Sequence, residues 1–287
     1  MIKVKEPTTY EEQIAKLRSR GCMIADENEC RAFLERVSYY RLSAYFLPFI
    51  NRDTDMYSPG ITFERIVHIY GFDRRLRHLI FAAIEDVEIH LRSAFSYYHA
   101  HKYGAEGYLV GGNFSDKHDA QRFKDKLQRE IENNKNAPYV KHHIERYGNR
   151  FPLWVACELF SFGMLSYFYA DLKTQDAKRL AAKLYHTIPK NIKSWLRCCT
   201  DLRNICAHYG RLYYRKFSAI PAAMELQPMQ QRSLFGAILA LRALHPHSQK
   251  WNNEFIAGLQ AILEQYNADI CLEHIGFPDD WLEKLRK

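Results

Sequence analysis

The chain lacks long apolar runs. None of its apolar stretches approaches the roughly 18 residues that a membrane-spanning helix needs. Residues 1–7 contain no hydrophobic region of the kind that marks a secretory signal. The seven cysteines form no C-x-x-C pair, and their odd number argues against a disulfide framework. These absences predict a cytoplasmic protein with buried, free thiols and no contact with a membrane.

Motifs that bind metals or nucleotides are also missing. There is no H-E-x-x-H, D-x-D-x-D-G or doubled C-x-x-C pattern, so we expect no metal ion. No P-loop, G-x-G-x-x-G or G-x-S-x-G is present, which removes support for ATPase, dehydrogenase and α/β-hydrolase functions and for a bound cofactor. Neighbouring histidines point in different directions on a helix, so we expect surface residues at three pairs: His99/His101, His142/His143 and His245/His247.

Strand signals are nearly absent as well, because the sequence has no clean alternating runs and no hairpin dipeptides between apolar segments. Apolar residues instead recur at steps of three and four, as in amphipathic helices. The clearest helix covers residues 63–102, with Gly71 as a candidate break. An all-α fold is therefore predicted. The other expected helices are 11–20 ending at Gly21, one capped by Asp26 or Asn28, and 116–133, 138–147, 154–172, 177–185, 227–244 and 252–267.

What the sequence does contain is positive charge and aromatic side chains. Its formal net charge is +8 with a pI near 9.0, and 14% of its residues are aromatic. Apolar residues make up 47%, which is typical of a folded globular protein. The basic balance favours a polyanionic partner such as nucleic acid.

One short segment brings together an arginine, a carboxamide and a histidine, namely Arg203, Asn204 and His208. An arginine can hold a phosphate through two donors, and an imidazole can transfer a proton near neutral pH. These groups suit metal-independent cleavage of RNA. The alternative is an ordinary ion pair, a solvent-facing amide and a histidine at a helix C-terminus, where cations are favoured.

Helix geometry limits how these three residues can cooperate. At about 100° per residue, Asn204 and His208 share a face, whereas Arg203 lies about 140° away from His208. Three arrangements would bring arginine and histidine together: a curling arginine side chain, a helix loosened near Gly210, or a second copy in a two-fold dimer. We expect Ser194 to cap this helix. Its predicted apolar stripe is Trp195, Cys199, Leu202 and Cys206.

Charged residues of the long helix form a second candidate cluster. Glu85, Glu88 and Arg92 lie on one face, and Glu88 and Arg92 have the favourable order for an i,i+4 ion pair. With Asp73, these residues are either a solvated face or a supporting set that orients Arg203 or His208.

A third cluster follows the motif directly and consists of Tyr209, Arg211, Tyr213, Arg215 and Lys216. Aromatic faces between basic side chains suit single-stranded RNA, in which bases stack and phosphates pair with cations. Equally, the tyrosines of such a segment can close the hydrophobic core.

The motif Arg203-Asn204-x-x-Ala207-His208, followed by Arg211, resembles the HEPN ribonuclease motif of Abi-type abortive infection proteins of bacteria. The resemblance covers roughly residues 8–216. Its other elements are Glu11-Glu12-Gln13-Ile14 with Leu17, Arg20 and Gly21, then Tyr39-Tyr40-Arg41-Leu42-Ser43-Ala44-Tyr45, Tyr70, Phe72-Asp73-Arg74-x-Leu76-Arg77, Ile84-Glu85-x-x-Glu88-Ile89-x-Leu91-Arg92, Pro152-x-Trp154 and Glu158-x-x-Ser161-Phe162-Gly163-x-Leu165-Ser166.

This resemblance implies a HEPN-type helical bundle over residues 61–216, with helical extensions over residues 1–60 and 217–287. It implies an endoribonuclease in which Arg203, Asn204 and His208 are catalytic and two motifs meet in a homodimer. RNA is the implied substrate, and by the same resemblance some members work with a small RNA. The alternative is a HEPN module that binds RNA or a protein without cutting. One departure is Tyr209, where the family often has a second histidine, so a second imidazole would have to come from another subunit.

Overall fold

The computed structural model describes residue 4 and residues 6–286. Within this part of the chain helix follows helix and no β-strand forms, which confirms the all-α prediction. The expectation of no leader sequence falls mostly on residues outside those described. The main helices are α1 Tyr10–Ser19, α2 Glu27–Arg36, α3 Tyr39–Ser43, α4 Phe63–Tyr103, α5 Ala120–Asn133, α6 Pro138–Tyr147, α7 Leu153–Ala156, α8 Phe162–Asp171, α9 Thr174–Tyr185, α10 Pro189–Ala207, α11 Pro228–Gln231, α12 Leu234–Leu244, α13 Ser248–Lys250, α14 Ala257–Gln265 and α15 Trp281–Leu285.

Helix α4 is the axis of the molecule, with 41 residues and a length of about 60 Å. The hydroxyl of Thr62 caps its start by accepting from the Arg65 backbone N–H at 3.1 Å, and Gly104 ends it with φ +84°. Gly71 does not break α4, contrary to expectation. A Cβ at position 71 would lie 3.2 Å from the hydroxyl of Tyr266, so this glycine allows the C-terminal region to approach α4 closely.

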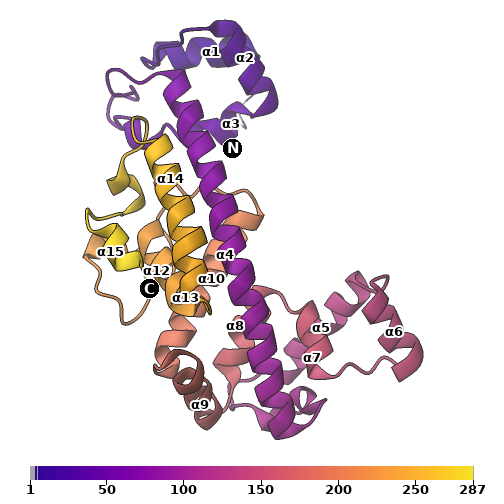
Figure 1. Ribbon diagram of the computed structural model, residues 1–287. Helices are drawn as coiled ribbons and strands as arrows, with labels where there is room; N and C mark the ends of the chain where they lie inside the picture. The colour runs from indigo at the N-terminus through magenta and orange to yellow at the C-terminus, as the bar shows by residue number, and fades with distance from the viewer. Residues whose placement is uncertain (1–3, 5, 287) are drawn as a thin grey trace.

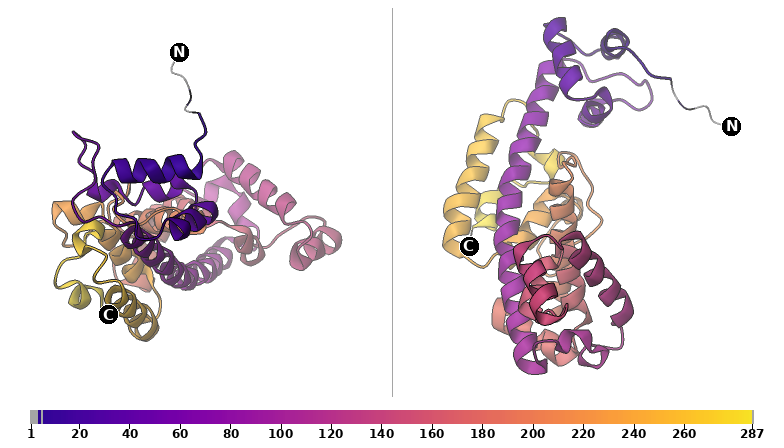
Figure 2. Two further views of the ribbon diagram at one scale, coloured as in Figure 1. Left: turned by 90° about the horizontal axis from the view of Figure 1, so that it is seen from above. Right: turned by 90° about the vertical axis from the view of Figure 1, so that its right-hand side faces the viewer.

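Helices α7, α8, α10, α12 and α14 pack against α4 at different positions along its length. Helices α1–α3 lie at one end of α4, and α5–α7 form an arm that projects near the other end (Figure 1). Helix α10 packs against α12, α8 and α4, and α14 packs along α4. The side views show α14 and α4 running alongside each other (Figure 2). The motif helix is thus enclosed between α4 and the C-terminal helices.

Helix α10 begins at Pro189, five residues before the predicted cap at Ser194. Proline is favoured in the first helical turn because its missing N–H needs no partner there. The Ser194 hydroxyl instead donates to the carbonyl of Ile220 at 2.7 Å and accepts from the N–H of Ala222 at 2.8 Å. It therefore holds the segment that follows the motif. The predicted apolar stripe is buried, as expected, at Trp195, Cys199, Leu202 and Cys206.

Two predicted helices prove to be interrupted at serine caps. The expected helix 154–172 is divided into α7, the 3₁₀ turn Cys157–Leu159 and α8, because Ser161 caps α8 through the N–H of Met164 at 3.3 Å. The expected helix 227–244 is divided into α11 and α12, with Ser233 as the cap of α12. The expected helix 252–267 begins with the π-helical turn Trp251–Ile256, and the one expected from residue 116 begins at Ala120.

Burial of single residues differs from expectation at two histidines. His99 is fully buried, and its ring stacks on Phe114 with centroids 5.0 Å apart. His245 is also buried, with Nε2 3.3 Å from an oxygen of Asp86. Six of the seven cysteines are buried, as their helical pattern indicated. In the described part of the chain, no helix is both long and apolar enough to cross a membrane.

Candidate functional site

The motif ends α10 in a sharp change of chain direction. The N–H of His208 donates to the Asn204 carbonyl at 3.0 Å, and the N–H of Gly210 donates to the Ile205 carbonyl at 2.7 Å. Tyr209 has φ +56°, the left-handed conformation with which many helices end. Asn204 and His208 are both exposed, as expected for two residues on one helix face, and no side chain in the described part of the protein bonds to either.

Arg203 lies on another face of α10, against α4. Its Nε is 3.8 Å from Oε2 of Glu88, and its guanidinium carbon is 6.0 Å from the centre of the Phe81 ring. Glu88 in turn accepts a hydrogen bond from Arg92 at 2.6 Å, in the predicted i,i+4 ion pair. The structure therefore places Glu88 between two arginines, with Arg203 half-buried. Glu85 is exposed one turn earlier and does not contact Arg203.

Arg203 and His208 of one chain do not meet. Arg203 faces Glu88, whereas His208 faces solvent at the end of α10. No hydrogen bond or ring contact joins them in the part of the chain that the structure describes. The angular separation expected from an ideal helix is thus kept.

Asp73 of α4 braces the segment after the motif. It is 0% exposed, forms an ion pair with Arg77 and accepts from the Tyr45 hydroxyl at 2.8 Å. It also accepts from the backbone N–H groups of Leu212 at 3.0 Å and Tyr213 at 2.7 Å. Burial raises the pKa of Asp73, against the opposing effect of Arg77 and the other donors. The carboxylate fixes the path of a backbone segment that is distant in sequence.

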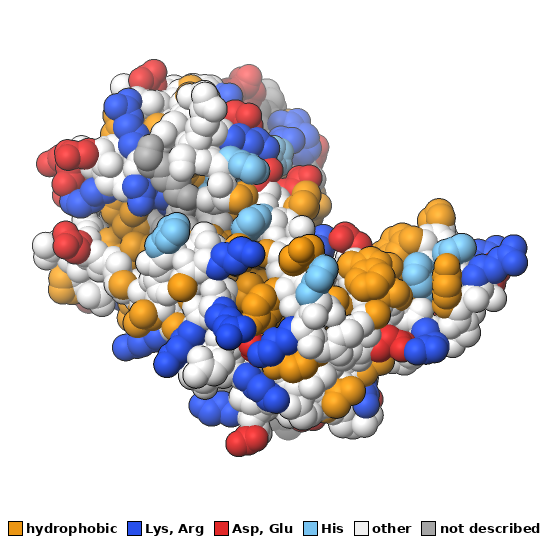
Figure 3. All heavy atoms as spheres, turned by 60° about the horizontal axis from the view of Figure 1, so that its bottom comes forward, with side chains coloured by type: hydrophobic (Ala, Val, Ile, Leu, Met, Phe, Trp, Pro, Cys, Tyr) orange, Lys and Arg blue, Asp and Glu red, His pale blue; other side chains and the backbone are white. Residues whose placement is uncertain are grey.

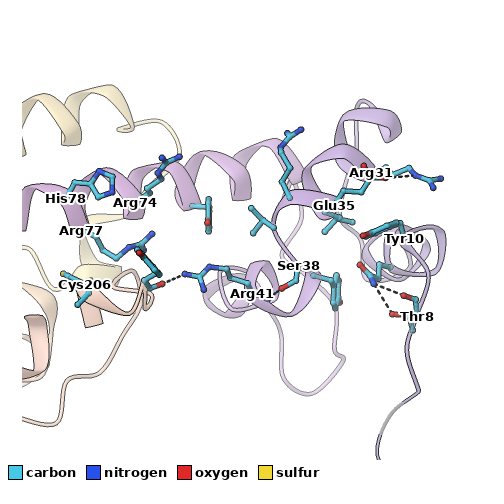
Figure 4. A pocket seen from close by; sticks show the side chains of 18 of the residues that line it. Thr8, Tyr10, Arg31, Glu35, Ser38, Arg41, Arg74, Arg77, His78 and Cys206 are labelled. Carbon is cyan, nitrogen blue, oxygen red and sulfur yellow. Dashed lines mark hydrogen bonds and ion pairs between the residues drawn. The ribbon is translucent and has the colours of Figure 1, made fainter. Parts of the chain in front are cut away.

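Two arginines hold the turn itself. Arg41 of α3 donates to the carbonyl of Tyr209 (Figure 4). Arg77 donates to the carbonyl of Gly210 at 3.2 Å. The role of Arg41 was missed in the sequence. The available signal was the position of this arginine within the aromatic segment 39–45, which contributes to the family resemblance.

A groove of about 1640 Å³ opens beside this turn, between helices α1–α3 and the first half of α4. Figure 4 shows Arg74, Arg77 and His78 along α4 on one side of it and Arg41 and Ser38 on another. Ala207 and Tyr209 also line it, so the groove reaches the motif. Its charged and aromatic lining residues include Arg36, Arg74, His78, Tyr39, Tyr70 and Glu85.

The segment after the motif is partly accessible. Tyr209 is 68% exposed, and Arg215 and Lys216 are exposed as well. Arg211 is half-buried, and burial lowers its pKa. Its Nη1 is buried without a hydrogen-bond partner in the described part of the protein. The exposed residues of this cluster are therefore Tyr209, Arg215 and Lys216.

Tyr213 belongs to the core, and its prediction as an RNA-stacking residue is wrong. It is 0% exposed, its hydroxyl lies 2.7 Å from Nδ1 of His274 and it accepts from the N–H of Cys271 at 2.9 Å. Tyr213 instead closes the hydrophobic core, which was the alternative interpretation for the tyrosines of this segment.

The neighbourhood offers little for thiol or metal chemistry. Burial raises the pKa of Cys206 to about 12, so its thiol stays protonated at neutral pH and is a poor nucleophile. Among the described residues, no three His, Cys, Asp or Glu side chains come together as a metal site. The reactive groups at the end of α10 are thus a guanidinium and an imidazole.

A family model described as "Abi-like protein" matches residues 32–214, well over half of the chain. The chain belongs to the Abi-like protein family. The part that matches the Abi-like model runs from α2 through Asp73, Glu88 and the motif to the segment that Asp73 braces. Helices α11–α15 lie outside it. No curated protein and no solved structure shows significant similarity to the chain.

Proposed function

We propose that this Abi-like protein is a metal-independent endoribonuclease that acts in abortive infection. The observation that carries the proposal is the setting of the motif: Arg203 forms an ion pair with Glu88 at 3.8 Å, close to the helix end that exposes His208. A cation held in a fixed position can stabilise a negatively charged transition state, and an exposed imidazole can reach a substrate.

The reaction proposed is transesterification. The ribose 2′-oxygen attacks the adjacent phosphorus, and the bond from phosphorus to the 5′-oxygen breaks. The products are a 2′,3′-cyclic phosphate and a 5′-hydroxyl. His208 accepts the proton of the 2′-hydroxyl, and a water molecule protonates the leaving 5′-oxygen. His208 supplies an imidazole, Arg203 binds the phosphorane oxygens through its paired donors, and Asn204 orients His208 or a phosphate oxygen.

The separation of Arg203 and His208 supports a homodimer with composite sites. In a two-fold dimer, the same surface of both chains meets itself, so two α10 ends can face each other. Arg203 of one chain would then act with His208 of the partner subunit.

The groove beside the motif supports RNA as the substrate. Its lining includes the exposed basic side chains Arg36, Arg74 and His78, which can contact phosphates. Tyr209, which is 68% exposed, offers a ring for an unpaired base at the mouth of the groove. DNA lacks the attacking 2′-hydroxyl, so we expect it to bind without being cut.

The test is to incubate purified protein with RNA in EDTA and to map the product ends. We expect cyclic-phosphate ends from the unaltered protein, and a loss of about 10²- to 10⁴-fold in rate for His208→Ala. The exposed His142 on α6 provides a matched control, since His142→Ala should leave cleavage unchanged. Metal-dependent cleavage with 3′-hydroxyl ends would overturn the mechanism. Binding of RNA without any cleavage would support a non-catalytic module instead.

A further inference from the structure

A second hollowed surface lies at the far end of α4, away from the motif. Two adjoining hollows of about 440 and 550 Å³ share Ser93, Tyr97 and His101 in their walls. At about 1.5 Å per residue, His101 lies roughly 20 Å beyond Glu88 along α4. This surface is therefore separate from the groove beside the motif.

Exposed aromatic rings dominate the shared wall. Tyr97 is 63% exposed and its ring centroid lies 4.0 Å from that of His101, with the planes tilted by 32°. Trp154 of α7 lines the second hollow and is 54% exposed. Flat exposed rings provide stacking surfaces for unpaired bases.

The charge of this surface is positive. Lys102 of α4 and Arg179 and Lys183 of α9 line the first hollow. No aspartate or glutamate lines either hollow within the described residues, and neither Arg179 nor Lys183 forms an ion pair there. On the face shown in Figure 3, Lys and Arg side chains lie among hydrophobic and histidine side chains near the base of the projecting arm, with few acidic groups between them. The surface thus complements a polyanion.

The carboxylate that pairs with Lys102 is fully engaged inside the protein. Asp176 is 0% exposed, pairs with Lys102 and accepts from the hydroxyls of Tyr98 at 2.7 Å and Tyr103 at 2.6 Å. Burial acts to raise its pKa, but these donors outweigh burial and hold the pKa below its ordinary value. The buried charge orders the wall of the hollow and is shielded from a ligand by its donors.

We infer that this surface, which we call the Tyr97 surface (Tyr97, His101, Lys102, Trp154, Arg179 and Lys183), binds single-stranded RNA. Unpaired bases stack on Tyr97 and Trp154, while Arg179 and Lys183 contact phosphates. A duplex keeps its bases stacked on one another and cannot use these rings. The inference rests on the proposed function for the choice of RNA, and adds a binding site that holds the strand away from the cleavage site.

The test measures binding by the full chain carrying His208→Ala, so that the RNA is not cut. A fluorescently labelled, unstructured single-stranded RNA is titrated and its anisotropy recorded. Loss of one stacking ring, by Tyr97→Ala or Trp154→Ala, should weaken binding roughly 5- to 100-fold, and Tyr97→Phe should retain it. The double change Arg179→Gln with Lys183→Gln should reduce the slope of log affinity against log salt by about 1.4.

Matched controls come from the projecting arm. Tyr147 of α6 is 56% exposed and Lys141 is exposed, so Tyr147→Ala and Lys141→Gln remove a ring and a cation elsewhere. These variants should bind like the His208→Ala parent. The inference is overturned if the Tyr97 and Trp154 variants also bind like the parent, or if duplex RNA competes as well as single-stranded RNA.

The outcomes separate this inference from the proposed function. If the Tyr97 and Trp154 variants lose binding but unaltered protein never cuts RNA, the cleavage proposal fails and the Tyr97 surface stands. If RNA is cut with cyclic-phosphate ends while these variants bind normally, only the inference about the surface fails.

Discussion

A carboxylate that is 0% exposed lies near each end of α4: Asp73 of α4 itself near the motif, and Asp176 of α9 near the Tyr97 surface. Asp73 accepts from backbone N–H groups about 140 residues later in the chain, at Leu212 and Tyr213. Among the described residues, the Asp176 carboxylate accepts from side chains alone, those of Tyr98, Lys102 and Tyr103. Their pKa values move in opposite directions, upward at Asp73 and downward at Asp176.

This difference shows two uses of a buried charge. Asp73 fixes the path of the backbone after His208, so its loss affects both the fold and the motif. Asp176 orders side chains around a surface hollow, and its cation partner Lys102 is about one-third exposed and can turn to water. We therefore expect the stability of the protein to depend more strongly on Asp73 than on Asp176.

The largest expected effect is on stability at Asp73. Asp73→Ala leaves Arg77 buried without its partner and two backbone N–H groups unpaired, so we expect a loss of about 3–5 kcal/mol in the free energy of unfolding. Asp176→Ala should cost less, about 1–3 kcal/mol, because Lys102 can be hydrated. Urea denaturation of both variants measures the difference. Equal losses at the two ends would contradict the comparison.

A pH effect should come from the Asp176 end. Burial lowers the pKa of His99 to about 4, whereas the unfolded chain takes up this proton near pH 6.5. Because protonation favours the unfolded state, stability should fall as the pH drops from about 6.5 to 4, by about 3 kcal/mol in all. His99→Phe should flatten this part of the stability curve. Denaturant midpoints measured across this range check the prediction, and an unchanged slope in the variant would refute it.

A smaller effect is expected at Glu88, between the two ends. Glu88→Gln removes the charge that positions Arg203, so we expect the rate of RNA cleavage to fall about tenfold, or roughly 1.4 kcal/mol, with RNA binding little changed. The exposed Glu145 of α6 gives the matched control, because Glu145→Gln removes a carboxylate outside the groove and leaves the Glu88 contact with Arg203 in place. Single-turnover cleavage assays compare the two. A loss of equal size in both variants would show that Glu88 has no special role.

Much of the helical fold could be predicted because burial follows a regular period. The long helix was expected over residues 63–102 and spans Phe63–Tyr103. The four residues of the predicted α10 stripe are all buried, but Ile192, Leu196 and Cys198 are buried as well and were not predicted. The break at Ser161 had a signal, since serine is a favoured cap, but the apolar run around it hid the boundary. The role of Gly71 could not be predicted from the sequence. A glycine is needed there because the side chain of Tyr266, which is distant in sequence, packs closely against α4 at this position.

In the candidate site, only the interactions within a single helix could be predicted from the sequence. The i,i+4 pair of Glu88 and Arg92 depends on one helix and was found from spacing. The contact of Glu88 with Arg203, the Asp73 brace and the burial of Tyr213 beneath His274 all depend on tertiary packing. A local pattern names the groups that can react, but it does not say which of them the fold brings together.

The central claim is that each active site combines Arg203 of one chain with His208 of the partner subunit. It is tested most directly by co-expressing the Arg203→Ala and His208→Ala chains with different tags, purifying the mixed dimer and measuring RNA cleavage in EDTA. Each variant alone should be inactive, whereas the mixed dimer has one intact composite site and should recover up to half of the unaltered rate. A mixed dimer that forms but remains as inactive as its parents would contradict the account.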